Sequence, residues 1–260
     1  MKKGLGILAA LLIIAAGGYV ALNQHSATKQ DIKKTVSKVK QSVSRETSAQ
    51  KKYPIKIKTG TEAAKLLIVV NKKHPLPSDY NPYNGAVTGN NPDGGGLMTA
   101  ANEAKSKLIL AMQQAGFPIA SNVSSFRYYS YQQSLYDGYV TQHGQSWADK
   151  YSARPGYSEH QSGMAFDLVG EDGDLPTSTT MYNWLKNHAY KYGLIIRYPK
   201  GKASITGYDQ EQWHLRYIGV KYATEMHEWG VATLEEFTGI SGGDYNSDKS
   251  ADVSALDEYK

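Results

Sequence analysis

Two short segments of the chain alternate between apolar and polar positions as β-strands do. The first has Met164, Phe166 and Leu168 alternating with Ala165, Asp167 and Val169, and the second has Trp213, Leu215 and Tyr217 alternating with His214 and Arg216. Successive side chains of a strand point to opposite faces, so Asp167 lies opposite Phe166 and His214 lies opposite Trp213. We therefore expect strands at residues 163–169 and 212–218, and further short strands at 119–127 and 194–198.

Helical patterns separate these strands. One helix is expected to run to about Ala115, with Thr99 as its cap and Gly116 as its stop. A second starts at Ser130, which forms a capping-box pattern with Gln133. A third contains Met181, Trp184, Leu185 and His188 and ends by Gly193. Helices and short strands joined by long loops predict an α+β domain with a mostly antiparallel sheet, flanking helices and a site in a cleft. Residues 81–96, rich in Asn, Gly and Pro, are expected to form a surface loop near that cleft.

The spacing of His160 and Asp167 requires a bend in the chain. His160 precedes Asp167 by seven residues, an odd offset that would place the two side chains on opposite faces of one continuous strand. Gly163 lies between them and tolerates backbone angles that other residues avoid. We therefore predict a turn at Gly163 that brings His160 and Asp167 to the same side.

His160, Asp167 and His214 are the residue types of a catalytic zinc site. Two imidazoles and one carboxylate leave a fourth position open for water, whereas structural zinc sites are usually closed by cysteines, and this chain has none. Zinc activates such a water at neutral pH. Glu211, three residues before His214 and not needed as a ligand, is the candidate general base. The other five histidines, His25, His74, His143, His188 and His227, have no such context.

The distribution of charge divides the chain into a basic segment and an acidic remainder. Residues 28–58 carry ten Lys or Arg against Asp31 and Glu46, whereas residues 59–260 carry 17 basic and 22 acidic side chains. The basic character thus belongs to a polar linker, predicted at residues 24–60, and not to the domain predicted at residues 61–240. This distribution argues against a nucleic-acid-binding core. Residues 241–260 are expected to be a disordered acidic tail.

The start of the chain has the pattern of an export signal. Lys2 and Lys3 precede an uncharged run from Gly4 to Leu22, which is 19 residues long and close to the roughly 20 needed to span a bilayer. Residues 1–23 are expected to be a membrane anchor or a signal peptide, with cleavage after Gly18 as the second possibility. The protein is therefore expected outside the cytoplasm, anchored to the membrane or secreted.

The metal motif also carries a family resemblance. Ser-x-His-x-x-Gly-x-Ala-x-Asp at Ser158–Asp167, followed by Glu-x-Trp-His at Glu211–His214, resembles the VanY-type D-alanyl-D-alanine carboxypeptidases, zinc peptidoglycan peptidases that share a fold with lysostaphin-like enzymes and hedgehog domains. Residues 67–77, 125–132, 193–199 and 233–237 are also similar to family segments. Tyr128, Gln210 and Gln212 depart from the family pattern, which leaves the shape of the substrate pocket open.

The resemblance implies roles for individual residues. His160, Asp167 and His214 would bind Zn²⁺, and Glu211 would be the general base. Arg127 would hold the terminal carboxylate of the substrate, and Gln132 and Ser158 would line the pocket. The tyrosine-rich stretch from Tyr128 to Tyr139 either packs or stacks on sugar rings, and we favour packing.

Three functional classes follow from these residues. The first is a carboxypeptidase that removes the C-terminal D-alanine from peptidoglycan stem peptides, with a D,D-carboxypeptidase slightly favoured over an L,D-carboxypeptidase that acts on tetrapeptide stems. The second is a peptidoglycan endopeptidase, and the third is an inactive wall-binding module. Glu211 favours an enzyme, and Arg127 favours an exopeptidase because a free chain end needs a cation to recognise it.

Overall fold

The computed structural model describes residues 34–38, 40, 53–82 and 97–245 of the 260-residue chain. The chain divides into two compact units, Met1–Ser44 and Arg45–Lys260. In the first unit, residues 34–38 and 40 are helical. The predicted anchor at 1–23 and most of the predicted loop at 81–96 lie outside the described residues. Among those that are described, no helix combines the length and apolar character required to cross a bilayer.

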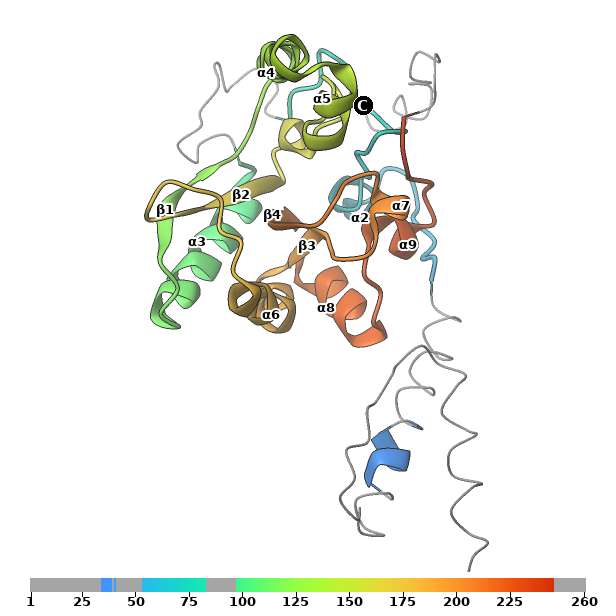
Figure 1. Cartoon of the computed structure of the whole chain (residues 1–260). Coiled ribbons are helices and arrows are strands. Elements are labelled where there is room, and N and C mark those ends of the chain that lie inside the picture. Colours follow the sequence, from blue (N-terminus) through green and yellow to red (C-terminus); the bar gives the residue numbers. More distant parts are fainter. Residues whose placement is uncertain (1–33, 39, 41–52, 83–96, 246–260) are drawn as a thin grey trace, which may run out of the picture. The chain divides into compact units, whose positions relative to one another are not determined.

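Four strands of the second unit form one antiparallel sheet in the order β1-β2-β4-β3 (Figure 1). The strands are β1 (Ile119–Ser124), β2 (Ala165–Gly170), β3 (Leu194–Tyr198) and β4 (Glu211–Tyr217). The α+β class and the antiparallel sheet expected from the sequence are confirmed, and each strand overlaps its predicted position. In the centre of the sheet, Asp167 on β2 lies opposite His214 on β4.

One face of this sheet carries the main hydrophobic core. Phe166 and Leu215 are neighbours across β2 and β4, and both are fully buried against α3 (Thr99–Gln114) and α6 (Thr179–His188), which lie beneath the sheet in Figure 1. Burial of each such side chain contributes roughly 1.5 to 3 kcal/mol. Because side chains alternate along a strand, packing of Phe166 and Leu215 into the core turns Asp167 and His214 to the opposite face.

A second core packs against α8 (Val220–Trp229) and α9 (Leu234–Thr238). Residues 53–57 belong to it, since Tyr53, Ile55 and Ile57 contact this core and the Ile55 N–H donates to the Phe237 carbonyl at 3.0 Å. The end of the predicted linker therefore lies inside the domain. The remaining elements are α2 (Glu62–Leu66), α4 (Tyr129–His143), α5 (Gln145–Tyr151), α7 (Ala203–Thr206) and the 3₁₀ helices η1 (Glu159–Ser162) and η2 (Ala189–Tyr192).

Two predicted helix caps differ in the structure. Met98, and not Thr99, precedes α3, and its N–H donates to the Gly163 carbonyl at 2.9 Å. Ser130 lies inside the first turn of α4 because the helix already begins at Tyr129. Tertiary contacts of the preceding residues override both local signals. The third helix, α6, continues through η2 and ends at Gly193 as predicted.

The first residues of the predicted disordered tail are packed on the domain. Lys72 Nζ lies 3.2 Å from an Asp244 carboxylate oxygen, and the Tyr245 hydroxyl accepts a hydrogen bond from the Arg154 N–H at 2.9 Å. The Arg154 guanidinium lies 4.1 Å from the centre of the Tyr245 ring. Residues 241–245 therefore form part of the folded domain, and the rest of the predicted tail, residues 246–260, lies outside the described residues.

Candidate metal centre and active site

His160 reaches the upper face of the sheet through the turn predicted at Gly163. The 3₁₀ helix η1 carries His160, and Gly163 ends it with a left-handed φ of +69°. Residues other than glycine rarely adopt this conformation. Strand β2 begins two residues later, so the chain reverses and His160 faces the same space as Asp167.

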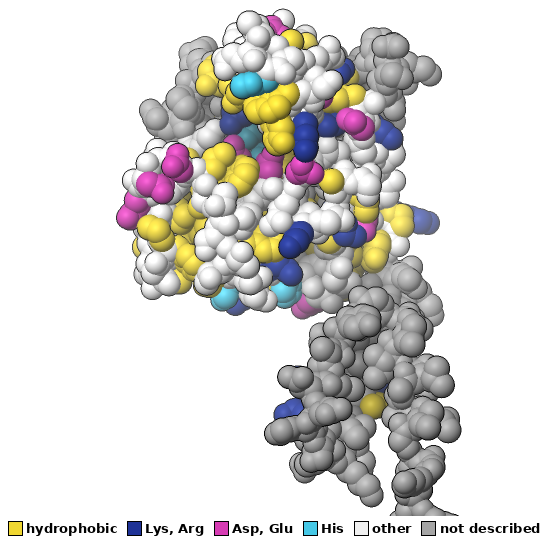
Figure 2. Space-filling view, in the orientation of Figure 1, with side chains coloured by type: hydrophobic (Ala, Val, Ile, Leu, Met, Phe, Trp, Pro, Cys, Tyr) yellow, Lys and Arg dark blue, Asp and Glu magenta, His cyan; other side chains and the backbone are white. Residues whose placement is uncertain are grey.

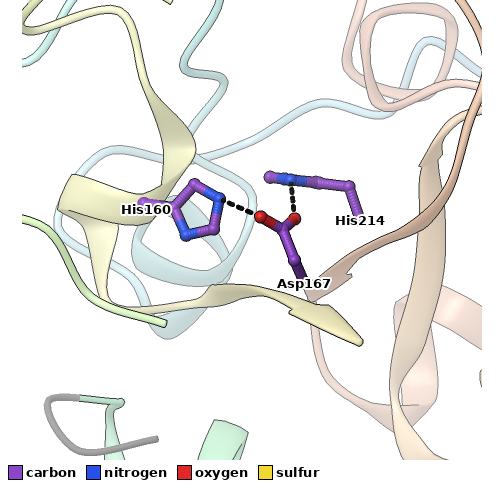
Figure 3. Close-up of side chains that lie close together, drawn as sticks. All are labelled: His160, Asp167 and His214. Carbon is purple, nitrogen blue, oxygen red and sulfur yellow. Dashed lines mark hydrogen bonds and ion pairs between the residues drawn. The ribbon is translucent and has the colours of Figure 1, made fainter. Parts of the chain in front are cut away.

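Three potential metal-binding atoms of His160, Asp167 and His214 lie within 4.8 Å of one another. His160 Nε2 is 3.2 Å from one Asp167 oxygen, and His214 Nδ1 is 2.9 Å from the other. Figure 3 shows both rings directed at this carboxylate. In the part of the chain that the structure describes, this is the one group of three such residues, and all three are buried.

The surroundings of His160 select the form of the ring that binds a metal. Its Nδ1 lies 2.6 Å from the Ser125 carbonyl oxygen, to which it donates, so Nε2, beside Asp167, is the nitrogen left to bind a metal. Burial lowers the pKa of His160, and the positive charge of Arg127 acts in the same direction. The neutral ring is therefore favoured, as metal binding requires.

Asp167 and His214 form the other half of the cluster. Burial would raise the pKa of Asp167, but His160 and His214 hold it well below its usual value, so the carboxylate is ionised. Burial lowers the pKa of His214, yet the nearby carboxylates of Asp167 and Glu159 outweigh it and raise the pKa to about 9. A metal binds the neutral ring, so metal binding here releases a proton.

This set of donors fits zinc. Two imidazole nitrogens and one carboxylate oxygen are the ligand types of open, catalytic zinc sites. Calcium and magnesium prefer sites built from oxygen alone. The ring of His160 is already oriented by its second nitrogen, a common feature of metal-ligating histidines.

Glu159 extends the cluster into the protein interior, and sequence reasoning gave it no role. Its Oε2 lies 3.5 Å from His214 Nε2, the nitrogen that points away from Asp167. Its Oε1 accepts hydrogen bonds from Arg197 and Arg216, each at 2.8 Å. Burial would raise the pKa of Glu159, but these two guanidinium groups hold it well below its usual value. A carboxylate is thus fixed behind His214, where it orients the ring.

Glu211 lies beside the metal-binding atoms. It is the first residue of β4, one residue before the predicted start of this strand, and its Oε2 is 3.8 Å from His214 Nδ1. Burial raises the pKa of Glu211 to about 7, although the positive charge of His214 opposes this. A carboxylate with a pKa near neutrality can both accept and return a proton at physiological pH.

Arg127, Gln132 and Ser158 all line the same pocket of about 190 Å³ as the cluster and Glu211. Arg127 Nη2 donates to the Ser124 hydroxyl at 2.7 Å and to Asp167 at 3.2 Å. Gln132 accepts from Arg127 Nη1 at 3.4 Å and donates to the Ala153 carbonyl at 2.8 Å. Gln132 therefore holds Arg127 in place, and its own amide already makes hydrogen bonds to the protein. Ser158 is buried and lines the pocket.

The pocket also contains side chains beyond the site residues predicted from the sequence. These include the aromatic residues Tyr139, Tyr151, Tyr198 and Tyr208 and the aliphatic residues Leu135 and Leu175. Trp213, in the motif between Glu211 and His214, lines it as well. Most of these residues come from helices and loops whose positions around the sheet were not evident from local patterns.

Comparisons with known proteins agree with this geometry. A family described as VanY, D-alanyl-D-alanine carboxypeptidase, matches residues 96–220. The putative carboxypeptidase YodJ of Bacillus subtilis is 34% identical over 232 residues, which cover 81% of this chain and 83% of YodJ.

Two solved structures are also similar. The LdcB LD-carboxypeptidase, described for its peptidoglycan recognition, is 50% identical with a TM-score of 0.61, covering 69% of this chain and 88% of LdcB. A mutant of the vancomycin resistance D,D-pentapeptidase VanY in complex with Zn(II) is 31% identical with a TM-score of 0.55, covering 66% of this chain and 98% of that one.

Proposed function

The chain belongs to the VanY family of D-alanyl-D-alanine carboxypeptidases and is a zinc carboxypeptidase of peptidoglycan peptides, and we propose that it removes D-alanine from tetrapeptide stems as an L,D-carboxypeptidase. The observation that carries the chemistry is the convergence of a His–Asp–His cluster, Glu211 and Arg127 in one pocket.

We assign each of these residues a role in hydrolysis. His160, Asp167 and His214 would hold the zinc, which acts as a Lewis acid when bound. Glu211 accepts a proton from the attacking water and returns it to the amino group of the departing D-alanine. Arg127 holds the terminal carboxylate through two N–H groups, and Gln132 keeps the guanidinium in place.

The preference for the L,D bond rests on the comparisons. Identity to the LdcB LD-carboxypeptidase is 50%, against 31% to the D,D-pentapeptidase VanY, over similar shares of this chain. This reverses the slight preference for D,D activity drawn from the sequence. The two activities differ in the residue before the scissile bond, which is D-alanine in a pentapeptide and an L-amino acid with a long side chain in a tetrapeptide.

Hydrolysis of matched stem peptides tests the specificity. The purified zinc enzyme is incubated with tetrapeptide and pentapeptide stems, and release of D-alanine is followed by mass spectrometry. We expect a higher kcat/KM for the tetrapeptide. A higher value for the pentapeptide would make the enzyme a D,D-carboxypeptidase, and equal cleavage of C-terminally amidated peptides would make it an endopeptidase.

The role of Arg127 predicts a specific kinetic defect. A charge-assisted, forked contact to a carboxylate contributes roughly 1.5 to 3 kcal/mol, so Arg127→Ala is expected to lower kcat/KM by about ten- to a hundredfold. Arg127→Lys should recover part of the loss because a point charge cannot make both contacts. Zinc content, measured by elemental analysis, should be unchanged in both variants.

Ser124→Ala is the matched control for Arg127. It removes one hydrogen bond to the guanidinium and leaves the charge in the pocket. We expect a loss of less than about tenfold in kcat/KM. If Arg127→Ala and Ser124→Ala were equally mild, Arg127 would serve the structure of the pocket and not the recognition of a chain end.

We also propose that the enzyme works outside the cytoplasm, at the cell wall. Its substrate is found there, and Lys2, Lys3 and the apolar run from Gly4 to Leu22 have the pattern of an export signal. Fractionation of cells that produce the full chain, with detection of its C-terminus, tests this. Recovery in the cytoplasmic fraction would contradict the proposal.

A further inference from the structure

Four aromatic rings gather on α4 and α5, three of them around Trp147. The ring of Trp147 is central, with its centroid 5.6 Å from that of Tyr139, 4.2 Å from that of His143 and 4.7 Å from that of Tyr151. Trp147 is 38% exposed and Tyr151 is 53% exposed. Figure 2 shows hydrophobic side chains gathered on the surface over these helices. We call these four residues the aromatic platform.

The aromatic platform is continuous with the active-site pocket. Tyr139 and Tyr151 line that pocket together with Glu211 and the metal cluster, whereas Trp147 and His143 lie beyond its lining. A ligand that extends out of the pocket past Tyr139 and Tyr151 therefore comes close to Trp147, which contacts both rings and is 38% exposed. Lys150, paired with Asp209 at 3.5 Å, adds a polar group next to Tyr151.

We propose that the aromatic platform binds sugar rings of the glycan strand from which the stem peptide extends. This inference rests on the proposed function, because it takes the occupant of the pocket to be a stem peptide. Three amino acids separate the scissile bond of a tetrapeptide stem from the sugar, a reach of roughly 10 Å. The sugar is thereby brought to the surface just outside the pocket.

The chemistry of the aromatic platform suits such a ligand. Sugar rings present flat C–H faces, and Trp and Tyr offer flat apolar faces with polar groups at their edges. These side chains have few rotatable bonds, so little conformational entropy is lost when a ligand covers them.

Glycan binding is tested with two substrates that share one stem. The full-length zinc enzyme and its Trp147→Ala variant are compared on a free tetrapeptide and on the same tetrapeptide attached to a soluble glycan chain. Loss of one aromatic contact predicts a kcat/KM about two- to tenfold lower on the glycan-linked stem, with no change on the free peptide. Trp147→Phe should restore most of the loss. Trp147→Leu, which keeps apolar volume without a flat ring, replaces the alanine variant if that variant does not fold.

Tyr131→Ala is the matched control, because Tyr131 is 37% exposed on the same helix α4 and lies outside the aromatic platform. It should leave both rates unchanged. Equal losses on both substrates in Trp147→Ala, or no loss on either, would overturn the proposal. A selective loss of binding to anionic lipid vesicles in place of glycan would also overturn it, since Trp and Tyr are common at membrane interfaces.

Direct binding separates this inference from the proposed function. Titration of the enzyme with N-acetylglucosamine oligosaccharides needs no hydrolysis, and the Trp147→Ala variant should bind them about two- to tenfold more weakly. If the wild type cleaves tetrapeptides but binds no oligosaccharide, the glycan site is wrong and the enzyme assignment stands. If it binds oligosaccharide through Trp147 but cleaves no stem peptide, the enzyme assignment is wrong and the glycan site stands.

Discussion

Alanine at both His160 and His214 is expected to abolish zinc binding and peptide hydrolysis together. The double change removes the two nitrogen donors and leaves Asp167, whose carboxylate would then face Arg127 at 3.2 Å without a competing cation. One carboxylate does not make a zinc site, which takes three protein ligands in catalytic centres. Metal per protein chain, measured by elemental analysis after dialysis, and D-alanine release report the two losses.

His188→Ala is the control for this double variant. His188 lies at the end of α6, where its Nδ1 donates to the Trp184 carbonyl at 2.7 Å and its ring stacks on that of Trp184. It has no contact with the metal cluster, so zinc content and activity should be kept. Stoichiometric zinc in the His160→Ala, His214→Ala protein would show that the metal is held elsewhere.

Glu211→Ala is expected to separate metal binding from turnover. Zinc should remain bound because the three ligands are intact, whereas kcat should fall by about a hundred- to ten-thousandfold because the attacking water loses its proton acceptor. Asp209→Ala, which removes an exposed neighbour from a surface ion pair with Lys150, should change kcat little. Near-normal turnover in Glu211→Ala would assign the proton transfer to another group.

The pH dependence follows from the same carboxylate. Glu211 must be ionised to accept a proton, so kcat/KM should fall as the pH drops through its pKa. Burial raises the pKa of Glu211 to about 7 in the metal-free protein, and the charge of a bound zinc lowers it from there. In the wild type, kcat/KM should therefore fall on the acidic side with a midpoint at or below about pH 7. In Glu211→Ala, the residual activity should not show the fall that protonation of Glu211 causes.

Local patterns were sufficient to predict the sheet and the metal cluster. Alternation along residues 164–169 placed Asp167 on a strand face, and the odd spacing from His160 required the turn that the structure has at Gly163. Both inferences use properties of one short segment alone, namely the two-residue alternation of a strand and the backbone angles open to glycine.

Contacts between distant segments could not be predicted from such local patterns. Nothing beside Glu159 in the sequence indicates that it is enclosed by Arg197 and Arg216, which lie 38 and 57 residues further along the chain. A charged residue inside the apolar run Leu194–Tyr198 was the one available signal, because a buried arginine requires an acidic partner. The aromatic platform likewise depends on how α4 and α5 meet. The tyrosine-rich stretch from Tyr128 to Tyr139, taken by itself, favours packing.

The buried charges behind His214 have a consequence for how the protein tolerates mutation. Glu159, Arg197 and Glu235 are linked in series, since Arg197 also donates two hydrogen bonds to Glu235 at 2.7 and 2.9 Å. Loss of one member leaves an uncompensated charge in the interior, at a cost of about 3 to 5 kcal/mol, which is a large part of the stability of a typical domain. Substitutions at these positions should therefore survive selection mainly in combination. In a randomised library we expect these three residues and Arg216, which also pairs with Glu159, to be retained as a set or replaced as a set.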